Sequence, residues 1–265
     1  MPIGLKYSEV DKMGFELKQK GEFEYIDEGE GEVLLLLHGL FGALSNWDDV
    51  VNKFSQNYRV VIPLLPIYSM PLKKAGIKGI TAFVERFVED QAFQDFTVIG
   101  NSLGGHIGLE YTINNADKVK GLILTGSSGL YEDTMGGSFP KRGDYNFVKE
   151  KVAYTFYDPA IATKDLVDYV FEVTTSNMKC LRIIAIARSA QTHNMADDLH
   201  QIKAPTLLIW GLNDTITPPF VGHEFNRLIK GSELAFIDNC CHAPMMEVPS
   251  RFNELVENFL TKHKL

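Results

Sequence analysis

The stretch GNSLGG places one serine, Ser102, among three glycines directly after the apolar run FTVI. Glycine has no Cβ atom, so glycines on both sides of a residue allow a sharper turn of the backbone than other sequences do. The pattern Gly-x-Ser-x-Gly between a strand and a helix is typical of a turn that exposes the serine oxygen above the edge of a sheet. Ser102 is therefore a candidate nucleophile. The alternative is a strand-to-helix turn whose serine has no chemical role.

A serine hydroxyl is a poor nucleophile at neutral pH, because it needs a base within hydrogen-bond reach and an acid that orients the base. The sequence supplies both in loops after later apolar runs: Asp214 follows TLLIW, and His242 follows LAFI. Ligands and reacting groups gather at the carboxyl ends of the strands in open α/β sheets. We therefore predict a catalytic triad of Ser102, His242 and Asp214.

Other acids and histidines fit these positions less well. Asn213 cannot carry a negative charge, and Asp238 follows its apolar run too closely. If Asp214 were not the acid, Glu132 or Asp133 would be next. The remaining histidines fall in expected helical or packing segments and are interpreted as structural: His106, His193, His200, His223 and His263.

Attack on a carbonyl also needs donors for the oxyanion, usually two backbone N–H groups, one of them from the residue after the nucleophile. That residue is Leu103. The second donor is expected from the glycine-flanked loop HGLFG, with Leu40 as the first choice and Phe41 as the second. His38, which opens that loop, is expected to hold it by hydrogen bonds.

The elements that must position these residues follow from the hydropathy pattern. The alternating segments FELKQK and EFEYID predict an antiparallel hairpin at a sheet edge. Continuous apolar runs without alternation predict strands buried on both faces, as in a parallel sheet. These runs are VLLLL (33–37), RVVI (59–62), FTVI (96–99), GLILT (121–125), TLLIW (206–210) and LAFI (234–237). Helical spacing covers 80–93, 103–113, 219–229 and 249–260. The alternation predicts an α/β fold, a mostly parallel twisted sheet with helices on both faces.

One interval, between GLILT and TLLIW, breaks this alternation. It contains no convincing parallel strand, and 164–176 and 178–191 have helical spacing. We predict a helical lid over 129–203, inserted between two strands of a core made of 1–128 and 204–265. The alternative is a group of extra packing helices with no gating role.

Composition narrows the class of protein. A chain of 265 residues fits one large domain with an insertion. The net charge of −8 argues against nucleic-acid and anionic-membrane partners, since both need a basic surface. The first residues contain no apolar signal segment and no run is long enough to span a bilayer, so a cytoplasmic protein is expected.

Cysteine, histidine and glycine patterns bear on cofactors. The three cysteines, Cys180, Cys240 and Cys241, are expected to be free thiols, with a strained vicinal disulfide between the last two as the alternative. No clustered ligand spacing predicts a metal site, and the glycines match no nucleotide-binding pattern. We expect no cofactor, and the oligomeric state is left open.

With these regions in place, the chain resembles the α/β-hydrolases of the lidded, single-domain kind. HGLFG, GNSLGG, the Asp214 loop and the His242 loop match the four signature regions of that family, and the resemblance covers essentially the whole chain. Many relatives carry an Asp-x-Pro-Gly turn where this chain reads LLPIY at 64–68, which suggests an altered loop with Tyr68 and Met70 near the pocket. Relatives with an aspartate nucleophile are disfavoured, because Ser102 occupies that place. The fold hosts many chemistries, so the resemblance says less about the substrate.

A subgroup resemblance bears on the substrate. GNS with a following glycine pair, and the stretch YDPAIATKDLVDYVFEV, are similar to hydrolases that cleave carbon–carbon bonds in ring-fission products. Those enzymes resemble one another in a lid arginine for the substrate carboxylate and a tryptophan just after the histidine. The corresponding positions here read Tyr169-Val170-Phe171 and Ala243-Pro244.

The sequence therefore predicts a cofactor-free serine hydrolase that cleaves a small or medium-sized neutral ester through an acyl-enzyme. Its pocket is expected to be apolar and adaptable, because methionine fills irregular space. The expected pocket residues are Phe41, Leu130, Phe171, Met245 and Met246. One alternative is a carbon–carbon bond hydrolase of a ring-fission dienoate, in which Arg182 or Arg188 would supply the cation. Another is a lidded, hydrolase-like receptor for a small molecule.

Overall fold

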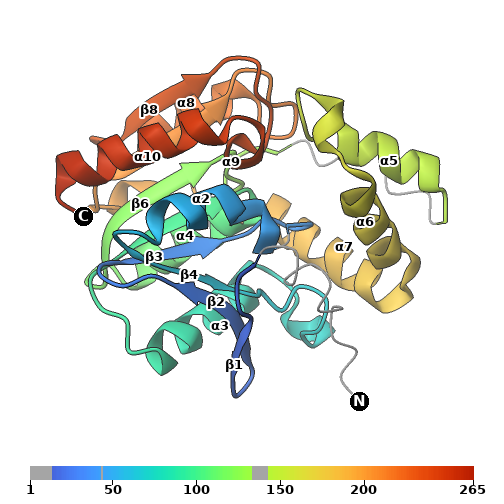
Figure 1. Ribbon diagram of the computed structural model, residues 1–265, viewed down its shortest axis with the longest axis horizontal. Coiled ribbons are helices and arrows are strands. Elements are labelled where there is room, and N and C mark those ends of the chain that lie inside the picture. Colours follow the sequence, from blue (N-terminus) through green and yellow to red (C-terminus); the bar gives the residue numbers. More distant parts are fainter. Residues whose placement is uncertain (1–13, 43, 133–142) are drawn as a thin grey trace.

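A computed structural model describes residues 14–42, 44–132 and 143–265. Eight strands of these residues form one sheet in the order β1-β2-β4-β3-β5-β6-β7-β8 (Figure 1). The β1–β2 and β2–β4 pairs are antiparallel, and the other pairs are parallel. The strands are β1 Lys18–Lys20, β2 Phe23–Glu28, β3 Val33–Leu37, β4 Arg59–Pro63, β5 Phe96–Asn101, β6 Val119–Thr125, β7 Thr206–Gly211 and β8 Glu233–Ile237.

Helices cover both faces of the sheet. One core lies between the sheet and α3, α4 and α8, and the other between the sheet and α2, α9 and α10. These helices are α2 Asp48–Phe54, α3 Ile77–Asp90, α4 Leu103–Asn114, α8 Pro219–Leu228, α9 Pro244–Glu247 and α10 Pro249–His263. Short 3₁₀ turns occur at η1 Leu44–Trp47, η2 Leu72–Lys74, η4 Pro159–Ile161 and η5 Leu199–Gln201.

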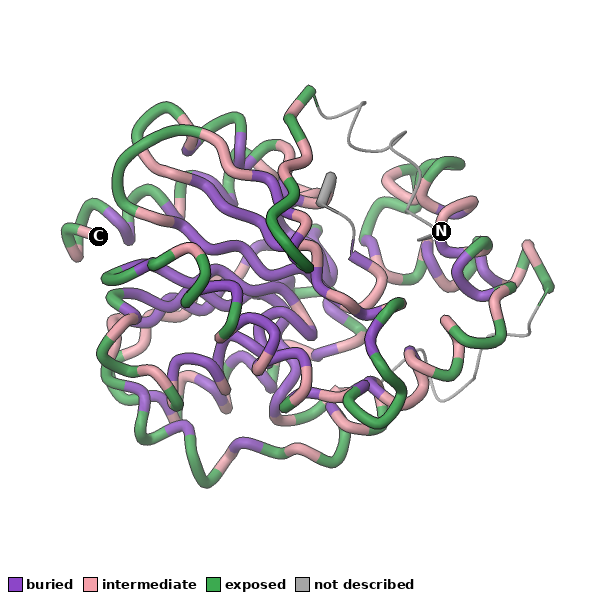
Figure 2. The backbone as a smooth tube through the Cα atoms, turned by 90° about the horizontal axis from the view of Figure 1, so that it is seen from below, coloured by how far each residue is buried: buried purple, intermediate pink, exposed green. Residues whose placement is uncertain are grey.

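The strand β3 shows why the sheet forms from unbroken apolar runs. Successive side chains of a strand point to opposite faces. Leu34 and Leu36 contribute to the core beside α2 and α10, and Leu35 and Leu37 to the core beside α3 and α4. All four are at most 1% exposed, and burial of each leucine stabilises the fold by about 1.5–3 kcal/mol. Figure 2 shows buried segments of the chain, in purple, through the middle of the molecule.

The segment between β6 and β7 is helical, with α5 at Tyr145–Ala153, α6 at Lys164–Thr175 and α7 at Asn177–Thr192. Figure 1 shows α5 and α6 away from the sheet, while α7 returns beside the core. The two ends of the segment meet, because the Met195 amide donates a hydrogen bond of 2.8 Å to the Gly129 carbonyl. Gating by this insertion stays a prediction.

The predicted fold class is confirmed, and the differences are local. α3 begins at Ile77, ahead of the predicted start at residue 80, because Ser189 Oγ in α7 accepts a hydrogen bond of 3.1 Å from the Ile77 amide. A hydrogen bond from a residue so distant in the chain leaves no local signal. The helices α2, α5 and α9 were not anticipated. Of the helices that the structure describes, none has the length and apolar character needed to cross a membrane.

Candidate active site

Ser102 lies in a strained turn between β5 and α4. Its φ of 54° and ψ of −119° fall in a region that residues other than glycine rarely adopt. Its amide donates a hydrogen bond of 3.1 Å to the Thr125 carbonyl at the end of β6. Its own carbonyl accepts hydrogen bonds of 3.1 Å from the amides of His106 and Ser128. Strain of this kind costs on the order of 1–3 kcal/mol and is held in place by the surrounding structure.

The glycines of GNSLGG allow three close approaches around this turn. A Cβ atom on Gly100 would lie 2.6 Å from the Gly104 carbonyl oxygen. One on Gly104 would lie 2.0 Å from the Leu37 carbonyl oxygen of β3, and one on Gly105 would lie 2.4 Å from Ser127 Oγ. The glycines therefore let α4 start directly against β3, with the serine at the carboxyl edge of the sheet.

Asp214 and His242 form a buried pair at the same edge. His242 Nδ1 lies 2.9 Å from Asp214 Oδ2, and the side chains of the two residues are 6% and 0% exposed. The carboxylate also accepts hydrogen bonds from the Ile216 amide at 2.8 Å and from the Thr217 amide and hydroxyl at 2.9 Å each. A carboxylate only accepts, so this arrangement assigns the proton to Nδ1 and leaves Nε2 as the acceptor of a neutral ring.

Two further residues, Asn101 and Gly126, lie against His242. Asn101 Nδ2 donates to the carbonyls of Thr125, at 3.1 Å, and His242, at 3.0 Å. Gly126 has a φ of +49°, and a Cβ atom there would lie 2.9 Å from His242 Nδ1. Asn101 was not predicted, although a polar side chain at the end of an apolar run was a visible signal.

Glu247 organises the histidine loop and was also not predicted. Its Oε1 accepts hydrogen bonds from the amides of Cys241, at 3.0 Å, and Ala243, at 3.2 Å. Its Oε2 accepts a hydrogen bond of 2.7 Å from the Tyr157 amide in the insertion. The Glu247 carboxylate thus connects the residues before and after His242 to the helical insertion.

The charge environment of His242 favours its protonated form. Burial alone would lower the pKa of the ring, but the nearby carboxylates of Asp214, Glu132 and Glu247 outweigh it and raise the pKa above the ordinary value of 6.5. Burial raises the pKa of Glu132, and the Ser128 hydroxyl and the charge of His242 oppose that rise. The site therefore gathers several carboxylates around one imidazole.

The Ser102 hydroxyl has no hydrogen-bond partner among the described residues, and the hydroxyl does not cap α4. The structure thus brings Asp214 and His242 into contact and places Ser102 at the same edge of the sheet. The Ser102 hydroxyl and the His242 ring do not form a hydrogen bond. Such contacts are often long in ligand-free enzymes and shorten when substrate binds.

Leu103 follows Ser102 directly, and the loop that carries Leu40 and Phe41 begins beside it at Gly39, while the oxyanion role of these residues stays a prediction. Leu103 is the first residue of α4, where the backbone N–H has no acceptor within the helix. The loop after β3 lies against the serine, since a Cβ atom on Gly39 would be 3.3 Å from Ser102 Cβ. Tyr68 OH donates to the Leu40 carbonyl at 3.1 Å and holds this loop.

His38 has the structural role that the sequence predicted. Its Nδ1 donates to the Gly39 carbonyl at 3.0 Å, and its Nε2 accepts from the Leu65 amide at 3.1 Å. Burial lowers the pKa of His38 to about 4. The ring is therefore neutral and committed to the loop.

The five expected pocket residues fall into two groups. Phe41, Phe171 and Met246 are half-buried and pack on the α2 side of the sheet, and Leu130 is half-buried on the α4 side. Met245 is 1% exposed and belongs to the α2-side core. Their contact with a substrate stays a prediction.

The thiols and the arginines are placed clearly. Cys180, Cys240 and Cys241 form no disulfide, as predicted. Arg182 Nε donates to the Met70 carbonyl at 2.7 Å, and Arg188 is exposed.

In the part of the chain that the structure describes, no group of three histidine, cysteine or acidic side chains is arranged to hold a metal ion.

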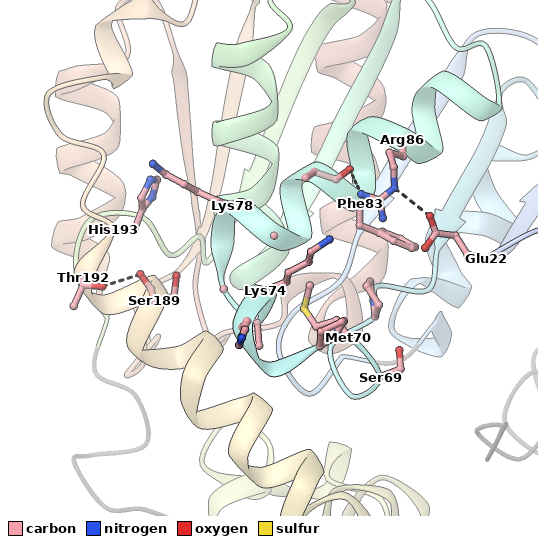
Figure 3. A pocket seen from close by; sticks show the side chains of 17 residues that line it. Glu22, Ser69, Met70, Lys74, Lys78, Phe83, Arg86, Ser189, Thr192 and His193 are labelled. Atoms are coloured by element: carbon pink, nitrogen blue, oxygen red, sulfur yellow. Dashed lines mark hydrogen bonds and ion pairs between the residues drawn. The ribbon is translucent and has the colours of Figure 1, made fainter.

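A separate surface cavity of about 970 Å³ lies where α7 meets η2 and α3. Figure 3 shows Ser189, Thr192 and His193 on one side of it and Lys74 and Met70 on the other, with the Lys78 side chain directed toward His193. Met70 also lines this cavity. Met70, which was expected near the catalytic pocket, thus lies at this outer cavity at the base of the insertion.

Known proteins resemble the whole chain. The model of the alpha/beta hydrolase fold family matches residues 32–179. A curated relative from Escherichia coli, named 2-hydroxy-6-oxononadienedioate/2-hydroxy-6-oxononatrienedioate hydrolase, is 28% identical over 289 residues, covering 97% of this chain and 96% of the relative.

Solved structures agree with that match. An α/β hydrolase enzyme from the metagenome of lagoon sediments at Mar Chica, Morocco, is 38% identical with a TM-score of 0.79, covering 94% of this chain and 100% of that one. A putative lipase from Acinetobacter baumannii has the same fold, with a TM-score of 0.82 at 24% identity, covering 100% of this chain and 98% of that one.

Proposed function

The chain belongs to the α/β hydrolase fold family, and on that premise we propose that it is a serine hydrolase. Ser102 is the nucleophile, His242 the general base and acid, and Asp214 the group that orients the imidazole. The observation that carries this proposal is the buried Nδ1–carboxylate contact of 2.9 Å between His242 and Asp214, at the sheet edge where Ser102 occupies its strained turn.

The reaction follows from these positions. His242 Nε2 takes the proton of Ser102 as Oγ attacks the substrate carbonyl, and Asp214 stabilises the imidazolium that forms. The amides of Leu103 and Leu40 donate to the oxyanion. Collapse of the tetrahedral intermediate expels the leaving group, which takes the proton from His242, and leaves an acyl-Ser102. Water, deprotonated by His242, then releases the acid and restores the serine.

For the substrate we place a small or medium-sized neutral ester first. A substrate carboxylate would need a fixed cation, and an unpaired buried charge costs several kcal/mol. Arg182 is engaged with the Met70 carbonyl, and Arg188 is exposed. Among the described residues, Glu132 is a further acid near His242, in addition to Asp214 and Glu247.

The second candidate is hydrolysis of a carbon–carbon bond in a ring-fission dienoate. The Escherichia coli relative is named for that reaction and covers 97% of this chain, so the comparisons by themselves favour it over the ester. The same serine, histidine and oxyanion donors would serve attack on its ketone. The two candidate substrates differ in one requirement, because the carboxylates of the dienoate need a cation in the pocket and the neutral ester does not.

The test is a multiple-turnover assay with neutral esters of increasing acyl length, a ring-fission dienoate and a lactone, on the wild type and Ser102→Ala. We expect ester turnover in the wild type and none above background in a folded Ser102→Ala protein. A stop near one product per protein molecule would indicate the receptor alternative. Efficient cleavage of the dienoate with poor ester turnover would favour the second candidate.

A further inference from the structure

Glu132 is an acidic residue that the proposed reaction does not use, and Ser128 links it to the backbone carbonyl of Ser102. The Ser128 hydroxyl donates a hydrogen bond to Glu132 Oε2. The Ser128 amide donates a hydrogen bond of 3.1 Å to the Ser102 carbonyl. Ser128 itself is 1% exposed, so its two contacts are fixed.

The segment that carries Glu132 is anchored on its other side. The Gly129 carbonyl accepts a hydrogen bond of 2.8 Å from the Met195 amide, and the Leu130 carbonyl accepts one of 3.3 Å from Asn194 Nδ2. Gly129 adopts a φ of +117°, a conformation that favours glycine. These hydrogen bonds fix the backbone where the chain enters the insertion. They thereby position Glu132 near the carboxyl edge of the sheet, where Ser102 lies.

The carboxylate has no ion-pair partner among the described residues. An acid that is largely withdrawn from solvent without a cation is unfavourable unless another group compensates it. The raised pKa of Glu132 reflects that burial, and the partial compensation comes from the Ser128 hydroxyl and from His242.

The other acids around His242 have complete roles. Asp214 accepts from the imidazole, from two amides and from the Thr217 hydroxyl. Glu247 accepts from amides on both of its oxygens. Glu132 differs from these two acids, because among the described residues its carboxylate accepts a hydrogen bond from one neutral donor, the Ser128 hydroxyl. Its negative charge is therefore available to interact with a ligand.

We propose that Glu132 determines substrate specificity, by repelling substrates that carry a carboxylate near the scissile bond and by favouring neutral or cationic ones. This inference rests on the proposed serine hydrolase. Two like charges that approach within a few ångströms of each other in a protein-lined site change affinity by about tenfold or more. Glu132 thereby supplies a physical reason for neutral substrates on a scaffold whose named relative acts on a dioate.

The test uses matched substrates that differ in charge alone. Each set contains a neutral ester, a carboxylate-bearing ester and a trimethylammonium-bearing ester of the same length, prepared once with the charge in the acyl chain and once in the alcohol. In the wild type, we expect kcat/KM for the anionic member to be at least about tenfold below the neutral one in one set.

The variants separate charge from structure. Glu132→Gln should raise the anionic-to-neutral ratio of kcat/KM by about tenfold, and it should move the acid limb of the pH profile to lower pH, because one carboxylate near His242 is gone. Glu132→Asp keeps the charge and should keep the discrimination. Glu172→Gln, on the exposed face of α6, is the matched control and should change neither quantity.

The outcomes are distinguishable. Equal use of anionic and neutral esters by the wild type would overturn the inference without any variant, and so would an unchanged ratio in folded Glu132→Gln or Glu132→Ala. In both cases ester turnover that depends on Ser102 would leave the proposed function intact. No ester turnover at all would instead contradict the proposed function.

Discussion

His242 and Asp214 are joined through Nδ1 and Oδ2 at 2.9 Å, in a setting where both side chains are almost completely buried. The contact fixes the tautomer that a general base requires, with the proton on Nδ1 and the lone pair on Nε2. It also ties the loop after β7 to the loop after β8, so the two residues depend on the register of neighbouring strands.

The pH dependence of catalysis follows from this pair. The active form needs a neutral His242, and the surrounding carboxylates raise the pKa of the ring above 6.5. Activity should therefore be present above that raised pKa and fall as the pH decreases through it. A profile of kcat/KM against pH with its acid limb below 6 would contradict this assignment.

Removing the charge of Asp214 tests the same contact from the other side. Asp214→Asn should lower kcat by about 10⁴-fold, because an amide favours the wrong tautomer of His242. Its remaining activity should show an acid limb at lower pH than the wild type. Near-normal turnover by Asp214→Asn would move the acid to another residue, with Glu132 the first to test.

Glu247 should contribute to both stability and catalysis, although it lies outside the triad. Glu247→Gln turns an amide NH₂ toward the N–H groups of Cys241, Ala243 or Tyr157, so at least one hydrogen bond is lost. We expect a loss of about 1–3 kcal/mol in the free energy of unfolding, together with a lower kcat. Urea titration measures the first quantity.

The control for Glu247 is Glu254→Gln on α10. Glu254 pairs with Arg251 on the surface, where both side chains are about half exposed. Such pairs contribute about 0–1 kcal/mol. Equal effects of the two substitutions on stability and rate would show that Glu247 has no special role in the histidine loop.

The adjacent thiols should be inert in the folded protein. Cys240 and Cys241 are 0% and 3% exposed, and burial raises the pKa of each thiol, so little reactive thiolate forms. Iodoacetamide should modify the half-buried Cys180 first and leave ester turnover unchanged. Peptide mass mapping identifies the modified residue, and inhibition in step with labelling of Cys241 would be the opposite result.

His38 should contribute to acid sensitivity. Its folded-state pKa of about 4 lies below the ordinary 6.5, so the unfolded chain binds the extra proton first. The stabilisation is complete above pH 6.5 and is lost as the pH falls toward 4, by about 3 kcal/mol. Urea titrations across this range should show a weaker dependence in His38→Gln, and an equal dependence would assign the effect elsewhere.

Sequence was most informative where one physical cause dominates. VLLLL and TLLIW were recognisable as strands because both faces of β3 and β7 are buried. Asp214 and His242 were predictable because parallel strands deliver their following loops to one edge. The glycines round Ser102 were likewise readable, since each one permits a close backbone approach.

Other features depend on residues distant in the chain. The start of α3 is set by Ser189, and the histidine loop is held by Glu247 together with Tyr157 of the insertion. Met245 and Met246 are neighbours of the same type, yet one is buried in the core and the other is half-buried. Tertiary packing decides such differences, and no local pattern records them.

The central claim is that Ser102 is the nucleophile activated by His242, and covalent labelling tests it most directly. A fluorophosphonate reacts with an activated serine whatever the natural substrate is. The account predicts one adduct per wild-type molecule, mapped by peptide mass spectrometry to Ser102, absent in Ser102→Ala and strongly slowed in folded His242→Asn. An adduct on Ser127 or Ser128, or equal labelling of the wild type and His242→Asn, would contradict it.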